Sequence, residues 1–332
     1  MFQNICIVGA GAIGGWIGAR LAAAGQPVNV VARGATLQAL RAHGLRLREG
    51  ALADERERSF AVRATDQPFD LGAQDLVIVA VKAPAMREVA SAIGPLLGPQ
   101  TAVLTAMNGV PWWFLQGLKG LVAGRTLESV DPGGAIGRAI GTERVLGCVV
   151  HASCSVDAPG VVRHRMGNGL IVGEPGGGVS ERAQALKALL RGAGFEVTLS
   201  GQIQQDIWYK LWGNMTVNPV CAMTGASADR VLDDELARNF LSAVMLEARE
   251  IGARIGVPIA QQPEDRHAIT RKLGALKPSM LQDVQARRPV ELDALVTAVR
   301  ELGQFTQTPT PFTDALLGLA RVHARVLGLY PG

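Results

Sequence analysis

Short apolar runs, many of them β-branched, alternate with helical patterns through the first half of the chain. Four of these runs predict buried parallel strands, over residues 4–10, 27–33, 75–83 and 101–108. Strands that alternate with amphipathic segments predict a doubly wound sheet. Between residues 143 and 174 the runs are separated by PG and GNG turns, which predicts an antiparallel extension. A helix near 180–193 and a strand at 195–199 complete this part.

Strand patterns stop near residue 200, and helical patterns separated by Gly and Pro replace them. We expect helices at 203–226, 232–256, 262–274, 279–286, 289–303 and 311–327. A length of 332 residues also favours two domains. The fold class expected is α/β. A Rossmann-type doubly wound sheet with an antiparallel extension occupies residues 1–200, and an all-α C-terminal domain occupies residues 201–332.

Composition narrows the class of protein. Hydrophobic residues make up 48% and charged residues 19%, which fits a globular protein and excludes wholesale disorder. The net charge is +4 and the basic residues are scattered, so no nucleic-acid partner is expected. No uncharged apolar run is long enough to span a membrane. The four cysteines lack metal-binding spacing, which predicts a cytoplasmic protein without metal or structural disulfides.

A glycine-rich turn follows the first predicted strand, and a helical pattern follows the turn. It reads Gly9-Ala10-Gly11-Ala12-Ile13-Gly14. In a dinucleotide-binding fingerprint the first glycine permits the tight turn, the second lets the backbone approach a pyrophosphate, and the third packs helix against strand. The position of this turn between a strand and a helix therefore predicts a dinucleotide site.

Three polar residues end predicted strands near this turn. Arg33 stands where an NAD-binding chain carries an acid, and a guanidinium pairs with a 2′-phosphate, so NADPH is the expected cofactor. The alternative is a solvated arginine at a strand end. Lys82 either contacts cofactor phosphate or ribose or is simply exposed. Asn108 either belongs to the site or forms an ordinary Asn-Gly turn with Gly109.

Lys210, Asn214 and Asn218 are spaced four apart in an otherwise mostly apolar run. On a helix this spacing advances about 40° per step, so the three side chains share one stripe. If these polar groups were buried without hydrogen-bond partners, they would destabilise the folded state. Either they satisfy each other and the backbone, or they line a cavity for a polar ligand, which we favour. Desolvation lowers the pKa of an amine, so Lys210 is a candidate general acid.

Two residues of the helical half are ambiguous. Ser279 forms a capping box with Gln282 in sequence, and a hydroxyl at a helix N-terminus also suits a carboxylate. Pro289 suits the first position of a helix, which places Glu291 in the first turn. There Glu291 either favours the helix dipole or contacts a ligand.

Together these segments resemble the ketopantoate reductase (2-dehydropantoate 2-reductase) family, whose members use NADPH in pantothenate biosynthesis. The matching segments are IVGAGAIGG, AVKA at 80–83, MNG at 107–109, WYKLWGNMTVNPVCAM and SMLQDVQARRPVELDAL. The last two are specific, and their order and separation also fit. The resemblance covers the whole chain.

The resemblance implies a role for each polar residue of the second half. Lys210 would donate the proton to the ketone, and Asn214 and Asn218 would contact the substrate. Ser279 would hold the carboxylate of the substrate, and Glu291 a hydroxyl of the substrate or of the cofactor ribose. Asn108 would lie between nicotinamide and substrate. We expect these residues to face the glycine turn across a cleft between the two domains.

Two segments depart from the family pattern. The family commonly reads TEID followed by an Asn-Gly pair, whereas this chain has VELD at 290–293 and then Val296-Thr297. The aromatic loop Trp112-Trp113-Phe114 follows Asn108-Gly109. It is either a docking patch between the domains or a pocket wall for a bulkier substrate.

The expected reaction is NADPH-dependent reduction of ketopantoate to pantoate, with a small 2-oxo acid as the partner. The first alternative is an NADP-dependent reductase of another branched or bulkier 2-oxo acid, or a β-hydroxyacid-type dehydrogenase. The second is a non-catalytic NADP-binding sensor. A homodimer is left open.

Overall fold

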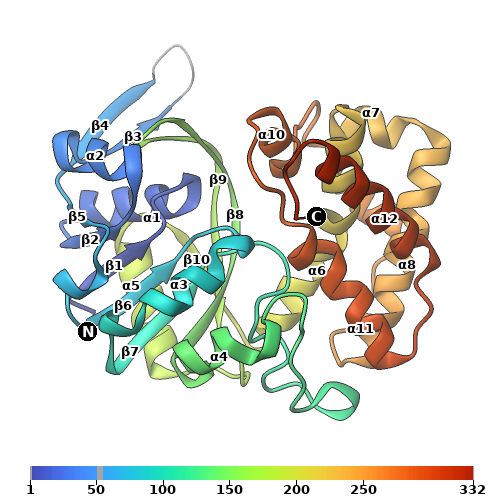
Figure 1. Ribbon diagram of the computed structural model, residues 1–332, viewed down its shortest axis with the longest axis horizontal. Coiled ribbons are helices and arrows are strands. Elements are labelled where there is room, and N and C mark those ends of the chain that lie inside the picture. The colour runs from blue at the N-terminus through green and yellow to red at the C-terminus, as the bar shows by residue number, and fades with distance from the viewer. Residues whose placement is uncertain (1, 51–54, 332) are drawn as a thin grey trace. The chain divides into compact units, whose positions relative to one another are not determined.

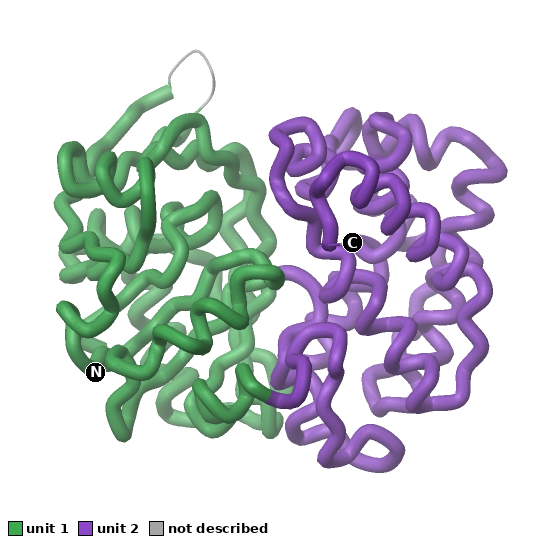
Figure 2. Tube along the Cα trace, in the orientation of Figure 1, with its two compact units in different colours: residues 1–107, 135–203 green, residues 108–134, 204–332 purple. Residues whose placement is uncertain are grey.

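The computed structural model describes residues 2–50 and 55–331 (Figure 1). The chain folds into two compact units (Figure 2). The first unit combines Met1–Met107 with Ala135–Ile203, and the second combines Asn108–Gly134 with Gln204–Gly332. The segment 108–134 therefore belongs with the second unit, although it lies within the first half of the sequence.

The described part of the first unit contains one ten-stranded sheet. Its strands are β1 (Ile5–Val8), β2 (Val28–Val31), β3 (Leu45–Glu49), β4 (Arg56–Phe60), β5 (Arg63–Thr65), β6 (Gln74–Val79), β7 (Leu97–Thr105), β8 (Val145–Ala158), β9 (Val161–Gly173) and β10 (Glu196–Ser200). Six of them are parallel in the order β5-β2-β1-β6-β7-β8. This is the Rossmann order, with its switch point between β1 and β6. An antiparallel β8–β9 pair extends the sheet. The expected sheet is confirmed.

Strands β3, β4 and β5 lie in a region where the sequence predicts no strand. β3 pairs with β9 in parallel and with β4 in antiparallel orientation. β4 is largely exposed, and β5 is only three residues long. β3 pairs with β9 more than a hundred residues away along the chain, and a local hydrophobic pattern does not encode such a contact. β5 instead pairs with β2.

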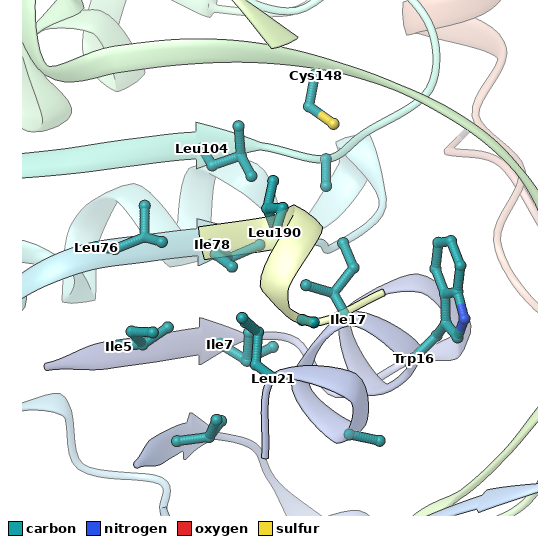
Figure 3. Close-up of a cluster of buried hydrophobic side chains, with 14 of the residues drawn as sticks. Ile5, Ile7, Trp16, Ile17, Leu21, Leu76, Ile78, Leu104, Cys148 and Leu190 are labelled. Atoms are coloured by element: carbon teal, nitrogen blue, oxygen red, sulfur yellow. The ribbon is translucent and has the colours of Figure 1, made fainter. Parts of the chain in front are cut away.

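Helix α1 (Ala12–Ala23) is the central helix of the first unit and contacts β1, β3, β8 and β9. Its buried residues Trp16, Ile17 and Leu21 meet strand residues such as Ile7, and Leu190 of α5 (Glu181–Gly192) joins the same cluster (Figure 3). Burial on this scale fixes α1, and with it the glycine turn at the start of the helix. Helices α2 (Gly34–His43), α3 (Met86–Ala92) and α4 (Ala135–Ile140) complete the unit.

The described elements after β10 are all helical, so the expected all-α C-terminal part is confirmed. They are α6 (Ile203–Thr224), α7 (Ala228–Asp233), α8 (Glu235–Arg254), α9 (Pro263–Arg271), α10 (Ser279–Gln285), a π turn (Asp293–Thr297), α11 (Ala298–Thr306) and α12 (Pro311–Val326). A break at Asp234, whose side chain accepts from the Ala237 N–H, separates α7 from α8. None of the helices described has both the length and the apolar stretch that a membrane span needs.

Candidate active site

The glycine turn lies at the switch point of the sheet. Gly9 has a φ of 93°, and a Cβ there would lie 2.6 Å from Cγ1 of Val81, just beyond β6. A Cβ on Gly14 would lie 2.1 Å from the Gly9 carbonyl oxygen. Only glycine therefore fits at these two positions. Around Gly11 the space is open, since a Cβ there would meet no atom within 4 Å.

The start of α1 offers what a pyrophosphate needs. Gly11 is the N-cap of α1, and the first turn contains no acidic residue and no side-chain cap. The first N–H groups of a helix lack intrahelical partners and carry the positive end of its dipole. Together with the open space at Gly11, this geometry fits a dinucleotide phosphate.

Arg33 follows β2 and is the N-cap residue of α2. Its guanidinium pairs with Glu88 of α3, and the two side chains are 65% and 59% exposed. An exposed ion pair contributes little stability, so a phosphate can replace Glu88 at low cost. No motif in the sequence marks Glu88, because its contact with Arg33 spans 55 residues.

Lys82 lies beyond the end of β6, where it begins a 3-10 turn (Ala83–Ala85). The side chain is half-buried, and the Lys82 carbonyl accepts a hydrogen bond from the Ala85 N–H at 2.9 Å. Gly9, Arg33 and Lys82 thus follow the carboxyl ends of three adjacent parallel strands, β1, β2 and β6. Ligands bind at this edge in sheets of this class.

In the second unit, α6 is fixed about its own axis by two tryptophans. The Trp212 Nε1–H donates to the Met245 carbonyl of α8 at 2.6 Å. Trp208 packs against Gly252 of α8, where a Cβ would lie 2.3 Å from the indole nitrogen. Both tryptophans are buried. This packing determines which way the polar stripe of α6 points.

The stripe begins with Lys210, whose ammonium donates to Oδ1 of Asn108 at 2.8 Å. Lys210, Asn108 and Asn214 are half-buried, and Asn218 is only 6% exposed. The structure therefore joins two residues that the sequence places 102 positions apart. The sequence predicts Asn108 within the first domain, residues 1–200, whereas the structure groups it with the helical unit.

The loop that carries Asn108 is seated on the π turn. Gly109 has a φ of 83°, and a Cβ there would lie 2.7 Å from both Cβ and the carbonyl oxygen of Ala294. The Val110 N–H donates to that same carbonyl at 2.8 Å. Asn108 is thereby held close to the helix that begins just after Glu291.

Two expectations about the helical half are wrong. The capping box of Ser279 and Gln282 does not form, because α10 begins at Ser279 with the extended residue Pro278 as its N-cap and has no side-chain cap. Gln282 instead donates from Nε2 to the Lys277 carbonyl at 2.8 Å, and Ser279 is exposed. Pro289 is not a first helical residue either.

The helix near Pro289 begins at Leu292, and the π turn follows immediately. The Glu291 carbonyl accepts from the Leu295 N–H at 3.2 Å, so Glu291 takes the N-cap position rather than the first turn. Its side chain is half-buried.

The aromatic loop is buried: Trp112, Trp113 and Phe114 are at most 6% exposed. Phe114 packs against Trp208 of α6, with ring centroids 5.9 Å apart. At least this contact lies within the helical unit, and it supports the helix that carries Lys210.

A further cation, which no sequence motif marks, lies beside the stripe. Arg266 of α9 is 5.7 Å from the centre of the Tyr209 ring, and a Cβ on Gly213 would touch its Nε at 2.5 Å. Burial lowers the pKa of Arg266, although a guanidinium keeps its charge in proteins. Arg266 therefore adds positive charge next to the α6 residues that flank Lys210 and Asn214.

Known proteins resemble this chain in sequence and fold. The family model described as ketopantoate reductase PanE/ApbA matches residues 5–177, and its C-terminal counterpart matches residues 202–324. A 2-dehydropantoate 2-reductase of Mesorhizobium japonicum is 45% identical over 99% of this chain and 100% of its own length.

Solved structures extend the comparison. A crystal structure assigned to ketopantoate reductase from Ralstonia solanacearum MolK2 is 55% identical, with a TM-score of 0.95 over 99% of this chain and 100% of that one. A D-mandelate dehydrogenase in complex with NADH and anilino(oxo)acetate aligns with a TM-score of 0.83 over 98% of this chain and 99% of that one. At 21% identity, this second likeness concerns the fold alone.

Proposed function

This chain belongs to the ketopantoate reductase family, and we propose that it reduces ketopantoate to pantoate with NADPH. The family consists of NAD(P)H-dependent oxidoreductases, so the chain is an enzyme. The observation that carries the proposal is the hydrogen bond from the Lys210 ammonium to Asn108. This hydrogen bond holds the proton donor of the polar stripe in one place, within otherwise apolar surroundings.

For the cofactor, we propose that residues 9–14 bind the pyrophosphate at the start of α1. Arg33 would pair with the 2′-phosphate, and Lys82 with phosphate or ribose. Asn108 and Glu291 would contact the nicotinamide end. The bound cofactor supplies a hydride to the C2 carbon of the substrate. The protein then has to stabilise the negative charge that develops on the ketone oxygen.

Lys210 would donate its proton to that oxygen. Negative charge grows on the ketone oxygen as the carbon is reduced, and a positioned ammonium stabilises the charge before it transfers the proton. Asn108 contributes by accepting a hydrogen bond from the ammonium, which limits the directions that Nζ can take. The buried neighbours Leu211 and Trp212 limit the access of water to the base of the lysine side chain.

We propose that Asn214 and Asn218 bind polar groups of the substrate and that the Ser279 hydroxyl holds its carboxylate. Glu291 would accept a hydrogen bond from a hydroxyl of the substrate or of the cofactor ribose. These are polar contacts in both ground state and transition state, so we assign them mainly to substrate binding.

A panel of 2-oxo acids tests the proposal. NADPH oxidation is followed with ketopantoate, with shorter branched 2-oxo acids and with an aryl-substituted one. The highest kcat/KM is expected with ketopantoate. An aryl or another branched acid as the best substrate would favour the alternative reductase. That alternative is tested because Val296-Thr297 replaces the Asn-Gly pair common in the family. Absence of turnover with every acid would contradict the proposed function.

A further inference from the structure

The π turn, Asp293–Thr297, lies two residues after Glu291 and contacts two distant segments. One of them is the Asn108 loop, through Gly109 and Val110. In a π turn the backbone hydrogen bonds run from i to i+5. The Val110 N–H donates to the Ala294 carbonyl of this turn at 2.8 Å.

The second distant segment is the one that follows α12. The Tyr330 hydroxyl donates to Oδ1 of Asp293 at 2.5 Å. The Thr297 hydroxyl donates to the same oxygen at 3.0 Å. One carboxylate oxygen thus ties the first residue of the π turn both to the last residue of the turn and to Tyr330. Burial and the bond to Asp293 both raise the pKa of Tyr330, so its hydroxyl keeps its proton at neutral pH.

The same segment also holds the residue before Glu291. The Val290 N–H donates to the Leu329 carbonyl at 3.1 Å. Leu329 and Tyr330 therefore bind the chain on both sides of Glu291, at Val290 and at Asp293. A π turn is rare, and a rare backbone conformation persists where the surrounding structure fixes it.

We propose that Tyr330 is a positioning residue, which holds the π turn so that Glu291 and the Asn108–Lys210 pair keep their active arrangement. The inference rests on the proposed function, since it assigns Tyr330 a purpose in that reaction. Tyr330 acts through Asp293 and not by touching the substrate. The specific group is its hydroxyl; the ring has a separate contact, because the Arg325 guanidinium lies 5.7 Å from its centre.

The test compares Tyr330→Phe with the wild type and with Arg300→Gln. The first removes only the hydroxyl. The second breaks an exposed pair between α11 and α12, Arg300 with Asp314 at 2.8 Å, which reports any general loosening of α12. The KM for the 2-oxo acid should rise about three- to tenfold in Tyr330→Phe, the size expected when one ordinary hydrogen bond to the substrate is weakened, and stay unchanged in Arg300→Gln. KM does not depend on the folded fraction, so partial unfolding cannot mimic this result.

Amide hydrogen exchange tests the same inference without a substrate. In Tyr330→Phe the amides of Val110 and Leu295 should exchange faster than in the wild type, because both donate to carbonyls at or beside the π turn. Arg300→Gln should leave them unchanged. Wild-type exchange rates and wild-type KM in Tyr330→Phe would overturn the inference. Lack of wild-type turnover would count only against the proposed function, and the exchange result would still decide whether Tyr330 holds the turn.

Discussion

At the scale of single residues, the surroundings of Lys210 explain why a lysine, and not an arginine, occupies this position. The ammonium donates to the Asn108 oxygen, and its neighbours along α6 are largely apolar. An ammonium gives up a proton far more readily than a guanidinium does. Only six of the 33 basic residues are lysines, so the choice is unusual for this chain.

Lys210→Ala should reduce kcat by roughly 10²–10⁴-fold, the usual contribution of a general acid–base group. NADPH affinity should change little, which fluorescence titration of the cofactor can measure. Lys272→Ala, at an exposed lysine of the same unit, is the matched control. Near-normal kcat in a folded Lys210→Ala enzyme would show that another group donates the proton, and Lys82 would be examined next.

Asn218→Ala should mainly raise the KM for the 2-oxo acid. Asn218 lies two turns beyond Lys210, and removal of a polar contact made equally in ground and transition states weakens binding without slowing proton transfer. Steady-state kinetics at saturating NADPH measure both parameters. A fall in kcat with unchanged KM would instead place Asn218 in the chemical step.

Arg33 and Glu88 should act in opposite directions on cofactor choice. Arg33→Ala should weaken NADPH by about 1.5–3 kcal/mol, the range for a hydrogen bond to a charged group, and hardly affect NADH. Glu88→Gln should favour NADPH modestly, because it removes a competing carboxylate from the guanidinium. The ratio of kcat/KM for NADPH and NADH is the measurement. Equal ratios for wild type and Arg33→Ala would exclude a 2′-phosphate contact.

At the scale of elements, a buried histidine links α9 to α8. His267 is 3% exposed, and its Nε2 lies 2.9 Å from the Ser242 hydroxyl. Burial lowers the pKa of His267 below its ordinary value near 6.5, so the folded state favours the neutral ring. This contribution to the free energy of unfolding is present above the unfolded pKa. It is lost as the pH falls through the folded pKa.

Denaturant unfolding between pH 8 and pH 5 should therefore show the wild type losing stability below about pH 6.5. His267→Asn keeps a polar partner for Ser242 but cannot titrate, so its stability should depend less on pH over this range. Parallel curves for the two proteins would assign the acid sensitivity to other groups.

Elements also show what a sequence can and cannot reveal. β1 with its glycine turn and α6 with its polar stripe follow from local patterns, because apolar spacing and glycine positions lie within one continuous segment. Other contacts join distant segments and leave no local pattern. These are the β3–β9 pairing, the contact of Arg33 with Glu88 and the packing of the Asn108 loop on Ala294. The predicted capping box at Ser279 does not form, because Pro278, one residue earlier, takes the N-cap position.

At the scale of the whole molecule, the chain passes between the two units three times, after Met107, Gly134 and Ile203. The helical unit is therefore built from two separate stretches, and residues 204–332 alone lack the loop that bears Asn108. An excised fragment 204–332 would expose the surface of α6 that Phe114 covers.

This discontinuity sets an order of events on the ribosome. Residues 108–134 emerge before the helices that receive them, and Trp208 follows Phe114 by 94 residues. At about 5–20 residues per second, this delay is about 5–20 s. Until Trp208 emerges, Phe114 has no α6 to pack against, so the nascent chain exposes an aromatic segment to chaperones while the sheet that surrounds it in sequence is still incomplete.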